Sequence, residues 1–245
     1  PWECALILGG AAVFADDSDR FAALFDPWSD AAPLRDPMLL RVHANRTAYR
    51  ALIEGGPALA RLREQQAPRG EFSRGVGYIE RWGEFIVGLS YIWEGQFLLA
   101  DKLLRPAVAS AEADLGRRNP FSCMLAALLA AAAWECDRPE DATALLADRL
   151  DILERSGMPE SLLLAYRTRA RIAPAAGAEH QALELLSALD AVGAARGLPR
   201  LRIASLTEQV RMHAARYRAA TCRELCERID QLLLDGDALP QGRVW

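Results

Sequence analysis

The sequence predicts an all-α fold, a right-handed superhelical solenoid of about six stacked helix pairs. Ala and Leu are abundant and the alternating patterns of strands are scarce, which favours helices throughout the chain. A short phrase also recurs at a nearly fixed interval. Ser156-Gly157-Met158-Pro159 is followed forty residues later by Arg196-Gly197-Leu198-Pro199, and Pro120 lies thirty-nine residues before Pro159. A constant period of this length is typical of stacked units that form a curved binding surface.

Residues 1–72 are the less regular part of the predicted solenoid. We expect two irregular helix pairs there, at Trp2–Phe14, Ser18–Phe25, Pro37–Ile53 and Pro57–Gln66. The stretch Asp26–Pro37 is rich in Pro and Asp and is predicted to be a loop, and Arg69–Gly77 is predicted to be a joint.

Residues 73–235 carry the repeats, with a period of about 40 residues. Four helix pairs are predicted: Ser73–Trp93 with Gln96–Leu115, Pro120–Glu135 with Pro139–Arg155, Pro159–Ala176 with Glu179–Arg196, and Pro199–Tyr217 with Thr221–Leu234. Residues 236–245 are interpreted as a tail or linker.

Gly and Pro are expected to fix the helix ends. Gly157 and Gly197 can accept the left-handed turn that satisfies the last carbonyls of a helix, whereas Pro159 and Pro199 are tolerated in a first turn. A small residue also recurs early in the second helices and should let paired helices approach closely. These positions are Ala100, Ala142 and Ala182.

Composition and charge argue against several classes of protein. The chain has 245 residues, of which 51% are hydrophobic and 25% charged, as in proteins with a sizeable core. No run of 18 apolar residues occurs, so no membrane association is expected. The net charge of −4 argues against direct nucleic-acid binding. The five cysteines are odd in number and widely spaced, which favours a cytoplasmic location over a disulfide framework.

No pattern of catalytic or metal-binding residues stands out. His43, His180 and His213 have no acid or cysteine at a known catalytic or metal spacing. Cys222 and Cys226 share a helix face and are interpreted as small buried residues, with half of a zinc site as the alternative. We therefore expect no catalytic residue, cofactor or metal in this chain, and no enzyme activity.

Three arginines are the predicted ligand anchors. Arg171 and Arg211 are forty residues apart and so occupy equivalent positions on successive first helices, and Arg167 lies one turn before Arg171. On the inner, concave face their guanidinium groups would bind carboxylate or phosphate in a bidentate manner. The alternative is a solvated face, or internal pairing with Glu160, Glu179 or Glu208.

An aromatic series at helical spacing is the second candidate surface. It includes Tyr78 and Trp82 and continues through Phe85 to Trp93. Such a stripe more often belongs to a core, and the alternative is ring stacking against a sugar or a hydrophobic effector.

The repeat Gly88-x-x-Tyr91-x-x-x-Gly95-x-x-x-x-Ala100-x-x-Leu103-Leu104 resembles the tetratricopeptide (TPR) pattern, although its period exceeds the usual ~34 residues. A second resemblance is carried by the segments Ala133–Pro159, Tyr166-Arg167-Thr168-Arg169-Ala170-Arg171-Ile172 and residues 193–202. This part of the chain resembles the helical sensor region of MalT-like, LuxR-type ATP-dependent transcriptional activators.

This resemblance implies an effector-sensing domain that binds a small molecule or a partner in its concave groove. It also implies an ATPase module and a DNA-binding module elsewhere in a longer protein, since the chain begins at Pro1 and holds no phosphate-binding loop. The alternative is a protein–protein interaction scaffold without a small-molecule ligand. Self-association is a further expectation.

Overall fold

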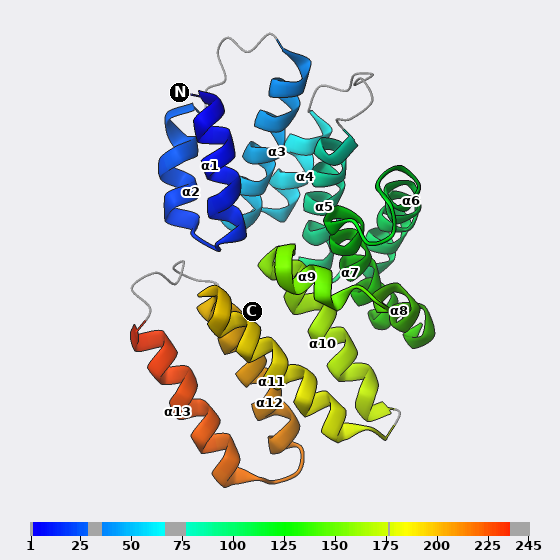
Figure 1. Cartoon of the computed structure of the whole chain (residues 1–245), viewed down its shortest axis with the longest axis vertical. Helices are drawn as coiled ribbons and strands as arrows, with labels where there is room; N and C mark the ends of the chain where they lie inside the picture. The colour runs from blue at the N-terminus through cyan, green and yellow to red at the C-terminus, as the bar shows by residue number, and fades with distance from the viewer. Residues whose placement is uncertain (1, 29–35, 67–76, 176, 236–245) are drawn as a thin grey trace.

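The structure, a computed structural model, describes residues 2–28, 36–66, 77–175 and 177–235. Within these ranges it contains thirteen α-helices, one 3₁₀-helix and no strand, which confirms the all-α prediction (Figure 1). The helices are α1 (Trp2–Phe14), α2 (Ser18–Phe25), α3 (Pro37–Ile53), α4 (Pro57–Gln65), α5 (Gly77–Trp93), α6 (Phe97–Leu115), α7 (Pro120–Glu135), α8 (Pro139–Leu146), α9 (Leu150–Ser156), α10 (Pro159–Ala175), α11 (Glu179–Arg196), α12 (Pro199–Ala214) and α13 (Ala219–Asp235).

The predicted joint at Arg69–Gly77 lies almost entirely outside the described residues, and the predicted tail 236–245 lies wholly outside them. Of the predicted loop Asp26–Pro37, the described part is a 3₁₀-helix at Asp26–Trp28 followed, after a gap, by the N-cap of α3 at Asp36.

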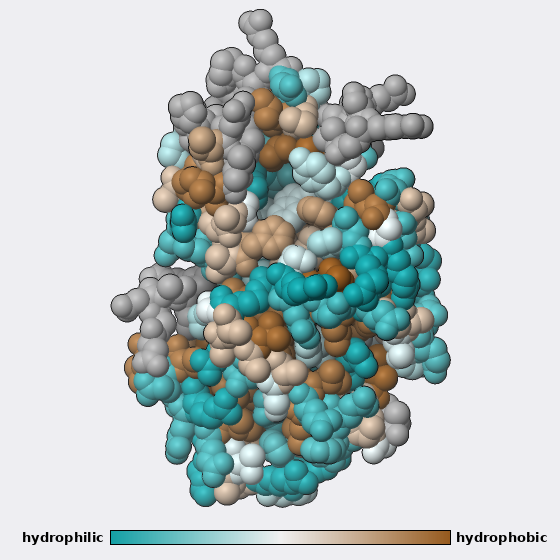
Figure 2. All heavy atoms as spheres, in the orientation of Figure 1, coloured by the Kyte–Doolittle hydropathy of each residue, from teal (hydrophilic) through white to brown (hydrophobic). Residues whose placement is uncertain are grey.

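Consecutive helices form six pairs in the described part of the chain. The pairs are α1–α2, α3–α4, α5–α6, α7 with α8 and α9, α10–α11, and α12–α13. First helices of neighbouring pairs also pack together, as α3 does on α5, α7 on α10, and α10 on α12. The stacking confirms a helical solenoid. On the face drawn in Figure 2, apolar side chains gather in a hollow between α1 and α5.

The turns inside the six pairs share one backbone geometry. Each contains a residue with φ between 57° and 91°, and these residues recur at intervals of 39 to 42 positions. In each turn the next amide donates to a carbonyl five residues earlier, at 2.8 to 3.1 Å. The six left-handed residues are Asp16, Gly55, Gly95, Asp137, Gly177 and Tyr217. This helix-ending motif, rather than a fixed residue, is what repeats through the fold.

Helix α7 forms the centre of the solenoid. Every residue from Ser122 to Ala133 is buried, because the helix contacts α5, α6, α8, α9 and α10 at once. A helix that is apolar on all sides belongs in a core. Helix α7 begins at Pro120, as predicted from the sequence. Asn119 caps it, because its Oδ1 accepts the amide hydrogen of Phe121 at 3.0 Å, and Pro120 occupies the first turn.

The predicted single helix Pro139–Arg155 is wrong, because the chain breaks between α8 and α9. Asp148 takes a φ of 56°, and the side chain of Arg149 is fully buried between the Ser122 carbonyl, at 3.2 Å, and the carboxylate of Glu112. Carbonyls freed by the break accept hydrogen bonds from Arg117 and Arg118. No Gly or Pro marks this position, so the break depends on tertiary contacts.

Two predicted helix ends also need correction. Gly157 is extended, with φ −76° and ψ 150°, rather than left-handed, and its role is close packing, since an added Cβ would lie 2.7 Å from the Leu153 carbonyl oxygen. Gly197 is left-handed as predicted, with φ 66°. Helix α12 ends at Ala214 instead of Tyr217, because Tyr217 itself supplies the left-handed turn. The small early positions of the second helices, Ala100, Ala142 and Ala182, are fully buried as predicted.

A buried ionic cluster joins the first helix pair to the start of α12. Arg200 forms a bidentate pair with Asp16, from the turn between α1 and α2, and its Nη2 lies 3.0 Å from Glu160 Oε1 on α10. Arg196 also donates to the Phe14 carbonyl at 3.4 Å. Only 7% of Arg200 and 2% of Glu160 are exposed, so the cluster is a buried contact between the first helix pair and the start of the last pair.

Burial and charge both act within this cluster. Burial lowers the pKa of Arg200, but the carboxylates of Glu160 and Asp16 outweigh it and raise that pKa. Burial raises the pKa of Glu160, and the guanidinium of Arg200 opposes that change. The positive charge of Arg200 therefore compensates the charges of two buried carboxyl groups, those of Asp16 and Glu160.

Replacing Gly95 by Ala should lower the free energy of unfolding by about 1–2 kcal/mol, because a Cβ is disfavoured in the left-handed conformation of the turn. Urea unfolding would measure the change. Gly77→Ala is the matched control: the residue is not left-handed, and a Cβ there would meet no atom within 4 Å. We expect the control to change stability by less than about 0.5 kcal/mol. Equal losses would contradict the role assigned to the turn.

Replacing Arg200 by Ala should destabilise the chain by about 3–5 kcal/mol, because it leaves two buried carboxyl groups without their cation. Hydrogen exchange should show the largest loss of protection in α1 and α2. The control is Arg155→Ala, whose side chain is 70% exposed and, in the part of the chain that the structure describes, pairs only within its own helix. Its expected effect is under about 0.5 kcal/mol. Unchanged protection of α1 and α2 in Arg200→Ala would refute the role of Arg200 in this contact.

Candidate functional site

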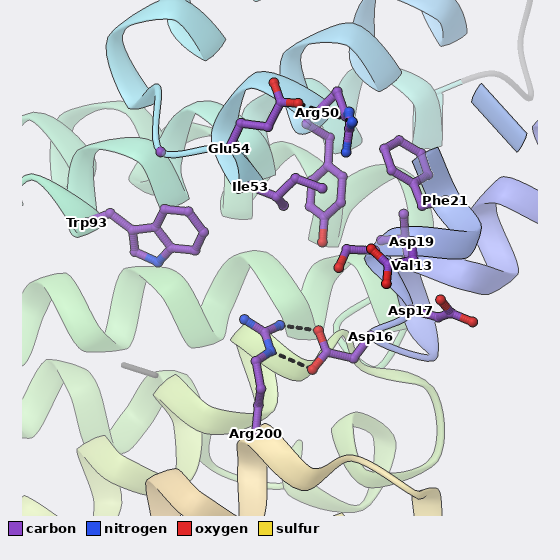
Figure 3. Close-up of a pocket in the computed structure, with 13 residues that line it drawn as sticks. Val13, Asp16, Asp17, Asp19, Phe21, Arg50, Ile53, Glu54, Trp93 and Arg200 are labelled. Carbon is purple, nitrogen blue, oxygen red and sulfur yellow. Dashed lines mark hydrogen bonds and ion pairs between the residues drawn. The ribbon is translucent and has the colours of Figure 1, made fainter. Parts of the chain in front are cut away.

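A cavity of about 410 Å³ lies on one side of the Arg200 cluster. Its walls come from the turn between α1 and α2, the end of α3, the end of α5 and the start of α12 (Figure 3). Phe21, Tyr49, Ile53 and Trp93 supply apolar surface. In Figure 3, Asp16 and Arg200 meet at the edge of the cavity and Trp93 lies across from Phe21.

Most charged groups of this first cavity are held by other protein groups. Arg50 pairs with Glu54 at 3.1 Å and with Asp26 at 3.4 Å. Asp17 accepts the amide of Arg20 at 2.9 Å and so caps α2. Burial, reinforced by Glu160, raises the pKa of Tyr49 well above its usual value. The phenol therefore stays protonated and keeps its hydroxyl hydrogen to donate.

A second cavity, of about 240 Å³, lies beside the first and shares Trp93 with it. It is bounded by the end of α5 and by α10, which are the first helices of their pairs. Its apolar walls are Leu89, Ile92, Trp93, Leu163 and Leu164. We call the two cavities together the inner groove.

Glu160 and Arg167 are the charged groups of the second cavity. Glu160 Oε1 is bound to Arg200, while its buried Oε2 has no hydrogen-bond partner among the described residues. The guanidinium of Arg167 makes no ion pair or hydrogen bond with any described residue. Burial and the neighbouring charge of Arg171 lower the pKa of Arg167, whereas Glu208 and Glu135 act on it in the opposite direction. A half-buried cation therefore borders an apolar cavity.

The other two predicted anchors are engaged in ion pairs. Glu208 lies between them, 2.7 Å from Arg171 Nη2 and 2.8 Å from Arg211 Nε. Arg171 also contacts Glu135 at 3.2 Å. Burial raises the pKa of Glu208, but the two arginines outweigh burial and leave the pKa below its usual value. The structure thus brings Arg171 and Arg211 together through an acid, as in the alternative considered above, and leaves Arg167 apart.

The two predicted aromatic residues lie outside the inner groove. Trp82 is 8% exposed and packs within about 6 Å of Phe14, Phe85 and Phe121. Tyr78 is 47% exposed, with its ring centre 6.0 Å from that of Phe121. Trp82 is thus a core residue, and Tyr78 lies at its edge. Both also border a third, smaller cavity.

Sequence patterns did not single out Asp16 and Arg200 as members of the site. They are 184 residues apart in sequence, and although Arg200 lies within the segment 193–202, no pattern links it to Asp16. Trp93 was recognised only as part of the aromatic series, and Glu160 only as an alternative partner of the arginines. The one sequence signal for Glu160 and Arg200 is their place directly after the recurring Gly-x-Pro phrase, which is followed by Glu160 in one repeat and by Arg200 in the next.

The described residues contain neither a metal-binding cluster nor a helix able to span a membrane. No group of three or more His, Cys, Asp or Glu residues in the described ranges is placed to hold a metal ion. Cys222 is partly exposed and Cys226 exposed, which contradicts the interpretation of this pair as buried. Among the described helices, none has the length and apolarity that crossing a membrane requires.

Comparison with known proteins supports the fold. No protein-family model matches the chain. No curated protein matches it either. Among solved structures, the chain is similar to a Podosopora anserina protein described as a kinesin light chain with nearly identical TPR-like repeats: TM-score 0.55 and 22% identity over 84% of this chain and 100% of that one. A single-residue variant of that protein gives a TM-score of 0.56 and 23% identity over 81% and 96% of the two chains. The chain thus has the TPR-like helical-repeat fold.

Proposed function

We propose that the chain is a binding module, without chemistry of its own, whose inner groove takes a small anionic ligand with an apolar body. The observation that carries this proposal is the guanidinium of Arg167, half-buried at an apolar cavity and without an ion pair among the described residues. A cation placed in this way is a good partner for a carboxylate, since charge-assisted hydrogen bonds to arginine are short and strong.

The walls of the groove suit the rest of such a ligand. Leu89, Leu163 and Leu164 can cover an aliphatic or aromatic body, and the shared Trp93 extends the apolar surface into the first cavity. The two volumes, about 240 and 410 Å³, together reach the range typical of small-molecule sites. Asp17 and Asp19 border the far end, where a cationic group of the ligand would be favoured.

In finer terms, we propose that this module is the effector-sensing region of a LuxR-type transcriptional activator. The segments Ala133–Pro159 and Tyr166–Ile172 resemble the sensor region of such activators, which supports this assignment. Arg167 belongs to the second of these segments. The groove borders the Arg200 cluster, so a ligand could favour one arrangement of the first helix pair relative to α12. It does so only if it binds that arrangement more tightly. The ATPase and DNA-binding modules would lie elsewhere in the full protein.

A protein–protein interaction scaffold is the second candidate. Leucines exposed on the second helices α4 and α6 favour it, with Leu98 76% exposed and Leu62 47% exposed. Exposed apolar surface of this kind marks protein contacts more often than small-molecule sites. Such a scaffold would bind a partner or a second copy of the chain on its outer face and leave the inner groove empty.

Calorimetry with benzoate, phenylacetate and hexanoate, each beside its neutral amide, tests the proposed ligand class. We expect saturable binding of at least one acid and much weaker binding of its amide. Arg167→Ala should weaken that binding by about tenfold to a hundredfold, the value of a charge-assisted hydrogen bond. Arg169→Ala is the control, because Arg169 lies two positions further along α10 and therefore on another face.

Three outcomes would count against the small-molecule proposal. One is no saturable binding of any acid. Another is equal binding of acid and amide. The third is an equal effect of Arg167→Ala and Arg169→Ala. Concentration-dependent self-association that is lost in Leu98→Ser would instead favour the scaffold.

A further inference from the structure

A third cavity, of about 140 Å³, lies between α1, α3, α5 and α7 and shares no lining residue with the inner groove. Four aromatic rings border it, those of Phe14, Tyr78, Trp82 and Phe121. Its position matches the apolar hollow between α1 and α5 in Figure 2. The volume is close to that of a dry protein cavity known to accept a benzene ring, roughly 150 Å³. The cavity is therefore suited to a small aromatic ring.

Asn45, one of the residues that line this cavity, has a buried hydrogen-bond acceptor that is left unused. Asn45 is 2% exposed, and its Nδ2 donates to the Ile79 carbonyl of α5 at 2.8 Å. Because that carbonyl can only accept, the amide orientation is fixed and Oδ1 is the remaining acceptor. Oδ1 is buried and has no hydrogen-bond partner among the described residues. A buried acceptor left in this state has a cost that a donor on a ligand would remove.

Arg46 limits the charge of the ligand. It lines the same cavity, and its guanidinium carbon lies 6.0 Å from the centre of the Trp82 ring. Burial lowers the pKa of Arg46 to about 10, so the group is a cation at neutral pH. A cation in the wall repels cationic ligands and attracts the faces of electron-rich rings. Unlike Arg167, however, Arg46 already has its guanidinium over two rings, those of Phe21 at 5.9 Å and Trp82 at 6.0 Å, so we expect it to be less available to an anion.

We infer that this cavity binds a small, uncharged, electron-rich aromatic ring with one hydrogen-bond donor, of the phenol or indole type, and that the donor bonds to Asn45 Oδ1. The aromatic walls provide stacking and edge contacts, and Asn45 selects the donor. This site is independent of Arg167 and of the inner groove.

Matched ligands test the donor directly. Indole and benzofuran have nearly the same shape, but benzofuran has an oxygen in place of the N–H group. In calorimetry or ligand-observed NMR, indole should bind about tenfold or more tightly than benzofuran, and phenol more tightly than toluene, since a donor relieves the buried acceptor. Equal affinities within a pair, or no saturable binding of indole or phenol, would overturn the inference.

Variants locate the site. Tyr78→Ala removes a wall that is 47% exposed, and it should weaken indole binding by about two- to tenfold, the value of one aromatic contact. Tyr217→Ala, at a 95% exposed tyrosine in the turn before α13, is the matched control and should bind indole as the unchanged chain does. A thermal melt would verify that both variants are folded. Equal binding by both variants would place the ligand elsewhere.

Two further measurements separate this site from the inner groove and from a surface for a protein partner. Arg167→Ala should bind indole with unchanged affinity, so a failure of the proposed inner-groove function leaves this test intact. An end-blocked Gly-Trp-Gly peptide distinguishes a free ring from the side chain of a partner. Saturable binding of the peptide without binding of free indole would overturn a small-molecule site and indicate a protein partner.

Discussion

The contact between the first helix pair and the start of the last pair depends on one guanidinium, that of Arg200, held between Asp16 and Glu160. Stacked repeats ordinarily contact only their neighbours. Here a contact across 184 residues brings the first helix pair against the start of α12. Two buried carboxyl groups are stable there because one cation serves both. The first cavity has Arg200 and Asp16 in its wall and the second has Glu160, so the inner groove owes its shape to this contact.

The repeat itself is a backbone property that several side chains can satisfy. A left-handed residue ends the first helix of each described pair, and it is Gly in three turns, Asp in two and Tyr in one. Glycine adopts this conformation at no steric cost, whereas Asp16, Asp137 and Tyr217 hold it because the surrounding hydrogen bonds fix the turn. This explains why the first helices α3, α5, α7, α10 and α12 all have 16 or 17 residues while the sequence of the turns that follow them changes.

An arginine remains available for a ligand only where no nearby carboxylate forms an ion pair with it. Glu208 engages Arg171 and Arg211 together, and Asp16 and Glu160 engage Arg200. Arg167 has no acid in contact among the described residues and lies against leucines and Trp93. Asn45 is a similar case. Its Nδ2 donates to the Ile79 carbonyl of α5, whereas its Oδ1 has no hydrogen-bond partner among the described residues. Both candidate sites are thus places where the fold leaves a polar group incompletely satisfied beside apolar surface.

The sequence by itself determined the helices and most of their ends. Pro159, Pro199 and the buried Ala100 act through contacts within one pair or across one turn, and such local signals can be found in a sequence. Only the tertiary structure decided the break at Asp148, the partners of Arg200 and the isolation of Arg167. These features depend on groups that lie 27 to 184 residues away in sequence, such as the Ser122 carbonyl and the carboxylates of Asp16 and Glu208. No periodic pattern specifies such contacts, because they arise from the packing of whole helices.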